Sequence, residues 1–254
     1  VGTFGGGLDR VDTGSGGFVH LRNDPDDPYS LSNDQIWAVY EDRVGAIWIG
    51  TFGAGINRYD RTQIKFHHYR SNPSDPNSLS ENVVWAFEQD RAGTLWIGTN
   101  GRGLNSLERG ARSDAPTPLF THYLHDPADP RSLSDNVIWS IEEASDGSLW
   151  IGTGQGLDRF EATTGRIAHY PMAPIFAIEQ DIEGFLWLGT WGSGLGRLDP
   201  ESGQLIFYEH DPGDLDSLGD GGVIAVHQDR DGELWIGTFN GGLNRLDRAT
   251  ERFL

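Results

Sequence analysis

The 254-residue sequence contains no cysteine, so it can form no disulfide and offers no thiol for catalysis or metal binding. A chain without cysteine is compatible with both the cytoplasm and the periplasm. No apolar run approaches the length that spans a membrane, and the first residues do not follow the pattern of a signal peptide. Composition alone therefore leaves the compartment open.

Positive charge is also scarce. There are 19 lysines and arginines against 38 aspartates and glutamates, which gives a formal net charge of −19. Such an acidic chain is a poor partner for nucleic acid or for an anionic membrane surface. We predict no nucleic-acid partner, and membrane attachment only through segments outside this sequence.

Glycine and tryptophan, in contrast, are abundant, with 35 and 9 copies, and they recur in a repeated hairpin. Residues 45–60, GAIWIGTFGAGINRYD, place two short apolar runs on either side of a glycine-rich turn, which is typical of a β-hairpin. Further copies occupy residues 93–108, 147–160, 184–199 and 232–247, and residues 1–12 are part of a sixth copy. A regular repeat of this kind indicates a repeat architecture rather than several ordinary domains.

The second strand of each unit predicts that neighbouring sheets interlock. Strand alternation puts Trp48 and Gly50 on one face, and Ile47, Ile49 and Thr51 on the other. Both faces are largely apolar, so this strand should be covered on both sides. The missing side chain at Gly50 leaves space beside the tryptophan ring, and the same Trp-x-Gly pair recurs in every full copy.

The complete unit has four strands, because an apolar run precedes each hairpin and a shorter one follows it. The threonine of the Gly-Thr pair falls at positions 3, 51, 99, 153, 190 and 238, which is the spacing of propeller blades. We predict an all-β propeller over residues 1–254, with a partial blade at 1–22 and full blades near 34–70, 82–124, 136–170, 174–210 and 222–254. Since Val1 falls partway through a strand, we expect a fragment of a larger propeller, with open edges. An insertion at 109–118 accounts for the longest spacing.

Polar loops join the blades at residues 23–34, 71–82, 125–136 and 210–221. Their Asp-Pro steps favour turns, and their serine hydroxyls can bond nearby backbone groups. Each loop carries one central leucine, which we expect to plug into the edge of a blade; these are Leu31, Leu79, Leu133 and Leu218.

These motifs resemble the two-component regulator propeller repeat, most fully at residues 30–59 and 78–107. The resemblance implies the periplasmic sensor region of bacterial hybrid two-component histidine kinases. In that family paired seven-bladed propellers precede a small β-sandwich, a membrane helix and cytoplasmic signalling domains, and many members sense breakdown products of polysaccharides. This chain has fewer blades and none of the downstream domains.

The function that the resemblance implies is periplasmic ligand sensing without catalysis, with a small molecule or oligosaccharide as ligand and with self-association or a second propeller as partner. We predict no cofactor and no metal site. A protein-interaction scaffold is the first alternative. The second is an enzyme similar to the streptogramin lyases, propellers that use His and Glu residues with a metal.

The distribution of histidines counts against the lyase. Four of the eight share one position in the outermost strand, and none is placed where a base at the channel mouth is needed; the four are His20, His68, His122 and His169. Residues 145–150, SDGSLW, echo the sialidase-type Asp box, which forms a turn and carries no activity.

Candidate ligand contacts lie in the loops on one propeller face, around the mouth of the channel. Trp191 is the tryptophan outside the two repeated sets, and we expect it either to stack on a ligand or to cover a neighbouring loop. The other candidates come from equivalent turns and loop ends: Phe52, Asn100, Arg102, Phe239, Asn240, Asp34, Asn82 and Asn136. The last three recur at one position, which also favours a structural role.

Overall fold

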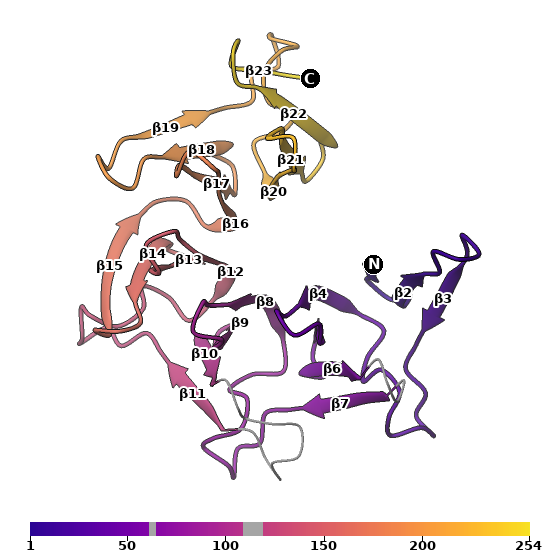
Figure 1. Ribbon diagram of the computed structural model, residues 1–254. Helices are drawn as coiled ribbons and strands as arrows, with labels where there is room; N and C mark the ends of the chain where they lie inside the picture. Colours follow the sequence, from indigo (N-terminus) through magenta and orange to yellow (C-terminus); the bar gives the residue numbers. More distant parts are fainter. Residues whose placement is uncertain (61–64, 109–118) are drawn as a thin grey trace. The chain divides into compact units, whose positions relative to one another are not determined.

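The computed structural model describes residues 1–60, 65–108 and 119–254. These residues form six antiparallel sheets, of which the first has three strands and the other five have four (Figure 1). The architecture confirms the predicted all-β propeller of four-stranded blades. The predicted insertion at 109–118 lies outside the described residues. Within the described ranges there is no helix of the length and apolarity needed to cross a membrane.

Each sheet follows chain order from its first to its last strand. The first three sheets are β1 (Gly2–Thr3), β2 (Gly7–Val11) and β3 (Phe18–Leu21); β4 (Ile36–Glu41), β5 (Ile47–Thr51), β6 (Ile56–Asp60) and β7 (Lys65–Tyr69); and β8 (Val84–Gln89), β9 (Leu95–Thr99), β10 (Leu104–Leu107) and β11 (Phe120–Tyr123). The last three are β12 (Ile138–Glu143), β13 (Leu149–Thr153), β14 (Gly156–Glu161) and β15 (Arg166–Pro171); β16 (Ile175–Gln180), β17 (Leu186–Thr190), β18 (Leu195–Leu198) and β19 (Leu205–Tyr208); and β20 (Val223–Gln228), β21 (Leu234–Thr238), β22 (Leu243–Asp247) and β23 (Arg252–Phe253).

The chain divides into two compact units. The first consists of Val1–His125 with Asn136–Ile138, and the second consists of Asp126–Asp135 with Trp139–Leu254.

Neighbouring sheets interlock at the glycine of the second strand, as the sequence predicts. In the first unit, a Cβ atom on Gly50 would lie 2.8 Å from the carbonyl oxygen of Val84, and one on Gly98 would lie 2.8 Å from Cγ2 of Ile138. In the second unit, a Cβ on Gly189 would lie 2.9 Å from Cγ1 of Val223. The first strand of each following sheet therefore occupies the space that the glycine leaves.

Polar side chains fasten the loops onto the sheets. The four loop leucines, predicted to plug into the edges of the blades, are at most 1% exposed and thus fully buried. In each loop a serine hydroxyl bonds the loop backbone, as Ser30 does with both the N–H and the carbonyl of Asp24. The outer-strand histidines bond the same loops: Nε2 of His68 lies 2.8 Å from the carbonyl oxygen of Ser30, and Nε2 of His169 lies 3.0 Å from that of Pro130.

Replacing Gly98 with alanine should destabilise the first unit by about 1–3 kcal/mol, because the new methyl group overlaps Ile138. Urea unfolding followed by tryptophan fluorescence measures the loss. Gly213→Ala is the control, since its Cβ would approach nothing closer than 3.3 Å, in an exposed loop. Equal stability of the two variants would contradict the interlock.

Two equivalent histidines should titrate differently. Burial lowers the pKa of His68, which pairs across the sheet with the neutral Asn57. Burial also acts to lower the pKa of His169, but its bonds to the buried Asp158 carboxylate and to Pro130 outweigh burial and raise that pKa. NMR titration should therefore give His169 the higher pKa, and Asp158→Asn should lower it.

The two histidines also affect stability in opposite directions. The contribution of His169 is full below its unfolded pKa of about 6.5 and is lost as pH rises through its raised folded pKa. The contribution of His68 is full above about pH 6.5 and is lost as pH falls through its lowered folded pKa. Unfolding midpoints between pH 5 and 8 check both signs, with His169→Gln and His68→Gln as the reference variants.

Candidate functional site

The second unit carries a row of four aromatic side chains, Trp139, Phe176, Trp191 and Phe239, which we call the aromatic ladder. Ring centroids are 4.2 Å apart between Trp139 and Phe176, 5.3 Å between Phe176 and Trp191, and 5.2 Å between Trp191 and Phe239. Trp191 is 49% exposed and Phe239 is 60% exposed. The ladder is a continuous aromatic surface that is open to solvent at one end.

Two kinds of backbone feature position the ladder. Pairing of β16 with β17 shifts register between Ile175 and Ala177, so Phe176 is the extra residue of a bulge, a feature that re-aims a side chain. Trp191 follows directly after β17, where its N–H donates to the carbonyl oxygen of Pro174 at 3.1 Å. Trp191 and Phe239 are thus among the candidates from the sequence, whereas Trp139 and Phe176 are not, although an aromatic residue recurs at that position of the first strand.

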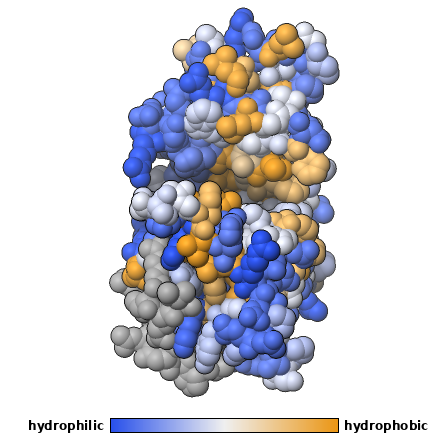
Figure 2. All heavy atoms as spheres, turned by 90° about the vertical axis from the view of Figure 1, so that its right-hand side faces the viewer, coloured by the Kyte–Doolittle hydropathy of each residue, from blue (hydrophilic) through white to orange (hydrophobic). Residues whose placement is uncertain are grey.

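The first unit has a related cluster, made by Phe4, Trp37, Phe52 and Trp85. The ring centroid of Phe4 lies 6.3 Å from that of Trp37 and 5.8 Å from that of Phe52, and Trp37 lies 5.9 Å from Trp85. Phe4, Trp37 and Phe52 are each more than two-fifths exposed. Exposed apolar residues stand out among hydrophilic ones in the space-filling view (Figure 2). Of the sequence candidates in this unit, Phe52 therefore lies among other exposed rings.

Asp34, Asn82 and Asn136 hold loops in place. Their side-chain oxygens accept hydrogen bonds from the backbone N–H groups of Asn23, Ser71 and His125, at 2.7, 2.8 and 2.8 Å. Their carbonyl oxygens each accept two further bonds from N–H groups of the preceding glycine-rich turn. These contacts match the structural role that their recurrence favours.

The other candidates lie in the glycine-rich turns. Arg102 is exposed, and its carbonyl oxygen accepts a bond from the hydroxyl of Ser80 at 3.0 Å. The N–H of Asn100 donates to the carbonyl oxygen of Val83 at 3.1 Å. The pKa of Asp220 is lowered, first by the N–H of Gly222 and also by a bond from the side chain of Asn240. Asn240 directly follows Phe239 of the ladder, so this polar side chain belongs to the same turn as an exposed ring.

One histidine–carboxylate pair lies at the other ends of the first strands, which lead into the acidic turns. Nδ1 of His227 is 3.5 Å from Oε1 of Glu179, and burial raises the pKa of that carboxyl group. The same oxygen accepts the N–H of Gln228 at 3.0 Å, and in the first unit Tyr40 accepts the N–H of Gln89 in the same way. The contact thus belongs to the packing of the repeat. Among the described residues, no group of three or more His, Asp or Glu is placed to hold a metal ion.

The comparisons with known proteins agree with this geometry. The family model for the two component regulator propeller matches residues 30–53, 78–101, 132–155 and 217–240. Each match runs from a loop through the first two strands of a sheet and into the glycine-rich turn. These four stretches are similar to the two component regulator propeller repeat. Among curated proteins, none matches the sequence.

Solved structures show the same architecture. The extracellular domain of a hybrid two-component system from B. thetaiotaomicron is 27% identical, with a TM-score of 0.80, over 98% of this chain and 32% of that one. PorZ, a surface component of the type-IX secretion system of Porphyromonas gingivalis, is 19% identical, with a TM-score of 0.73, over 95% and 36%. Virginiamycin B lyase from Staphylococcus aureus is 16% identical, with a TM-score of 0.70, over 98% and 76%. The likenesses to PorZ and to the lyase show the fold alone. This chain spans about a third of the length of the B. thetaiotaomicron protein and of PorZ.

Proposed function

We propose that the propeller is the extracytoplasmic, periplasmic ligand-sensing region of a bacterial signalling receptor, and that it binds without catalysis. The repeat match and the likeness to the extracellular domain of a hybrid two-component system support this assignment. Ligand occupancy would change how propellers or subunits pack, and that change would reach a kinase or other output domain. The partner in this packing would be a second propeller or a second copy.

The aromatic ladder is the proposed ligand contact. Flat, exposed rings beside polar turn residues suit a carbohydrate-derived ligand, because the apolar face of a sugar packs on an aromatic ring while its hydroxyls meet polar groups. Successive ring centroids are 5.3 Å or less apart, so the four rings pack against one another into one continuous surface. The exposed end at Trp191 and Phe239 is the observation that carries the proposal.

Trp191→Ala should weaken binding of an oligosaccharide ligand tenfold or more, since the ring contact is lost. Stability should fall by about 1 kcal/mol or less, because the side chain is half exposed. Titration calorimetry against a panel of neutral and acidic oligosaccharides measures the first effect, and thermal unfolding measures the second.

Phe207→Ala is the matched control, because Phe207 is an aromatic residue of the same unit that is 38% exposed on the outer strand β19. It should leave affinity unchanged. A scaffold without a small ligand would bind no member of the panel in either form. Turnover of a bound sugar by the isolated propeller would contradict the proposal outright.

A further inference from the structure

Four of the five full sheets share a contact, buried in three of them and partly buried in the fourth, that we call the Asp–Trp clasp. A carboxylate oxygen in the turn after the first strand accepts the indole N–H of the anchor tryptophan of the second strand. The pairs are Asp42–Trp48 at 2.8 Å, Asp90–Trp96 at 2.9 Å, Asp181–Trp187 at 2.8 Å and Asp229–Trp235 at 2.7 Å. The other oxygen accepts backbone N–H groups of the same turn, such as that of Phe185 on Asp181 at 2.9 Å. The clasp thus satisfies donors that would otherwise be buried and unpaired.

The sheet formed by β12–β15 lacks the clasp, because Ala144 stands where the others have aspartate. The turn N–H of Ser148 finds a substitute in Oδ1 of Asp146, at 2.9 Å. The indole N–H of Trp150 finds none: across the described part of the chain, no acceptor replaces the missing carboxylate. Trp150 is only 1% exposed, and the guanidinium of Arg159 lies over its ring at 5.5 Å.

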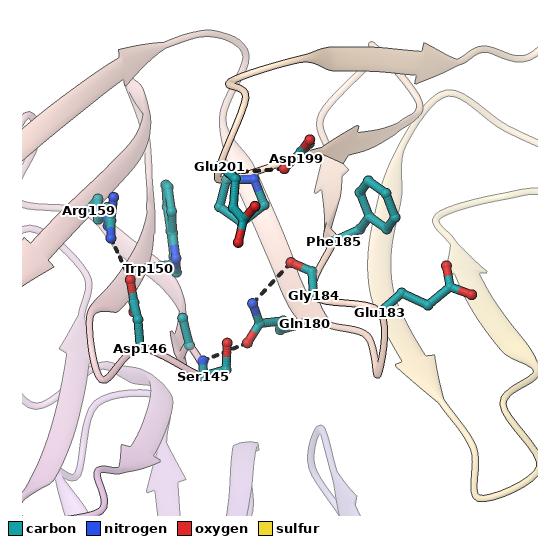
Figure 3. Close-up of a pocket in the computed structure, with 12 residues that line it drawn as sticks. Ser145, Asp146, Trp150, Arg159, Gln180, Glu183, Gly184, Phe185, Asp199 and Glu201 are labelled. Atoms are coloured by element: carbon teal, nitrogen blue, oxygen red, sulfur yellow. Dashed lines mark hydrogen bonds and ion pairs between the residues drawn. The ribbon is translucent and has the colours of Figure 1, made fainter.

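The unpaired indole group borders a cavity of about 470 Å³, between this sheet and the next. Figure 3 shows Trp150 on one wall, Phe185 on the other, Gln180 below and Glu201 projecting between them. Small-molecule sites fall in the range of about 300–1,000 Å³. The Trp150 side chain is otherwise buried and lines this cavity, so an acceptor on a ligand could take the place that the aspartate holds in the other sheets.

The charges around the cavity restrict what that ligand can be. Arg159 pairs with Asp146, and Arg248 lies 3.6 Å from Glu183. Asp199 stays ionised, because bonds from the Ser202 hydroxyl and the Glu201 N–H lower its pKa. The carboxylates of Asp199 and Glu201 are left without a cation among the described residues. They are not arranged to hold a metal ion.

We propose that this cavity is a binding site for a small zwitterion of the amino-acid class. Its carboxylate takes the position of the missing aspartate, against the indole N–H of Trp150. Its ammonium group faces the carboxylates of Asp199 and Glu201. A simple anion cannot make the ammonium contact with Asp199 and Glu201, and a simple amine cannot make the carboxylate contact with Trp150. The site is separate from the aromatic ladder and does not depend on the function proposed for it.

The test is an NMR titration that follows the indole N–H signal of Trp150. The probes are L-alanine and L-glutamine, with propionate as the match that lacks the ammonium group and ethylamine as the match that lacks the carboxylate. The amino acids should shift the Trp150 signal in a saturable way. Each single-charge probe should bind at least tenfold more weakly.

Ala144→Asp is the decisive variant, because it should rebuild the clasp and fill the site from within. It should abolish the shift of the Trp150 signal on addition of amino acid, and it should raise the unfolding temperature. Ser145→Asp is the matched control: it adds the same charge one residue away, and should change the affinity by no more than twofold. Glu201→Gln should weaken the amino acids while leaving the weak binding of propionate unchanged.

The proposal is overturned if neither amino acid shifts the Trp150 signal, which would mean that water alone satisfies the indole. It is also overturned if propionate binds as tightly as L-alanine, since the acidic wall would then contribute nothing. Unchanged binding in a correctly folded Ala144→Asp protein would place the ligand elsewhere. None of these results bears on oligosaccharide binding at Trp191.

Discussion

The structure depends on the close approach of each first strand to a glycine in the preceding sheet. At Gly98 there is no room for even one methyl group beside Ile138, and at Gly189 none beside Val223. Because the side chain is absent, two sheets come close enough to bury the anchor tryptophan between them, as with Trp187 at 1% exposed. Apolar burial of this kind is the main favourable term in folding, so the repeated Trp-x-Gly pair stabilises each interface between sheets.

This packing scheme also explains why so many polar residues of the repeat are poor candidates for function. The carboxylate of Asp42 binds an indole, the amide of Asn82 binds a loop N–H, and the ring of His68 binds a loop carbonyl. These recurrent polar groups are already satisfied by contacts within the repeat. Functional groups are more readily found where one unit departs from the rule, as Trp191 does in a turn and Ala144 does after β12.

The two candidate regions of the second unit differ in how they could be recognised. The aromatic ladder uses exposed rings that neighbouring strands and turns bring into line. The cavity beside Trp150 lies where one sheet lacks the carboxylate of the Asp–Trp clasp, so the indole N–H there has no aspartate partner. The first is a surface of exposed rings, whereas the second is a partly open polar cavity of limited volume. A receptor could use both without interference, because they involve different residues.

The sequence by itself determined the repeat, the four-stranded sheets, the loop leucines and the exposed position of Trp191, because each depends on local periodicity and turn chemistry. It also contained the alanine at 144, but the acidic Glu143 directly before it makes that turn resemble the aspartate-bearing turns of the other units. Only the tertiary structure decided that Trp139 and Phe176 join Trp191, and that Trp150 faces a cavity. Those facts depend on which side chains from different sheets meet, and spacing along one chain does not specify such contacts.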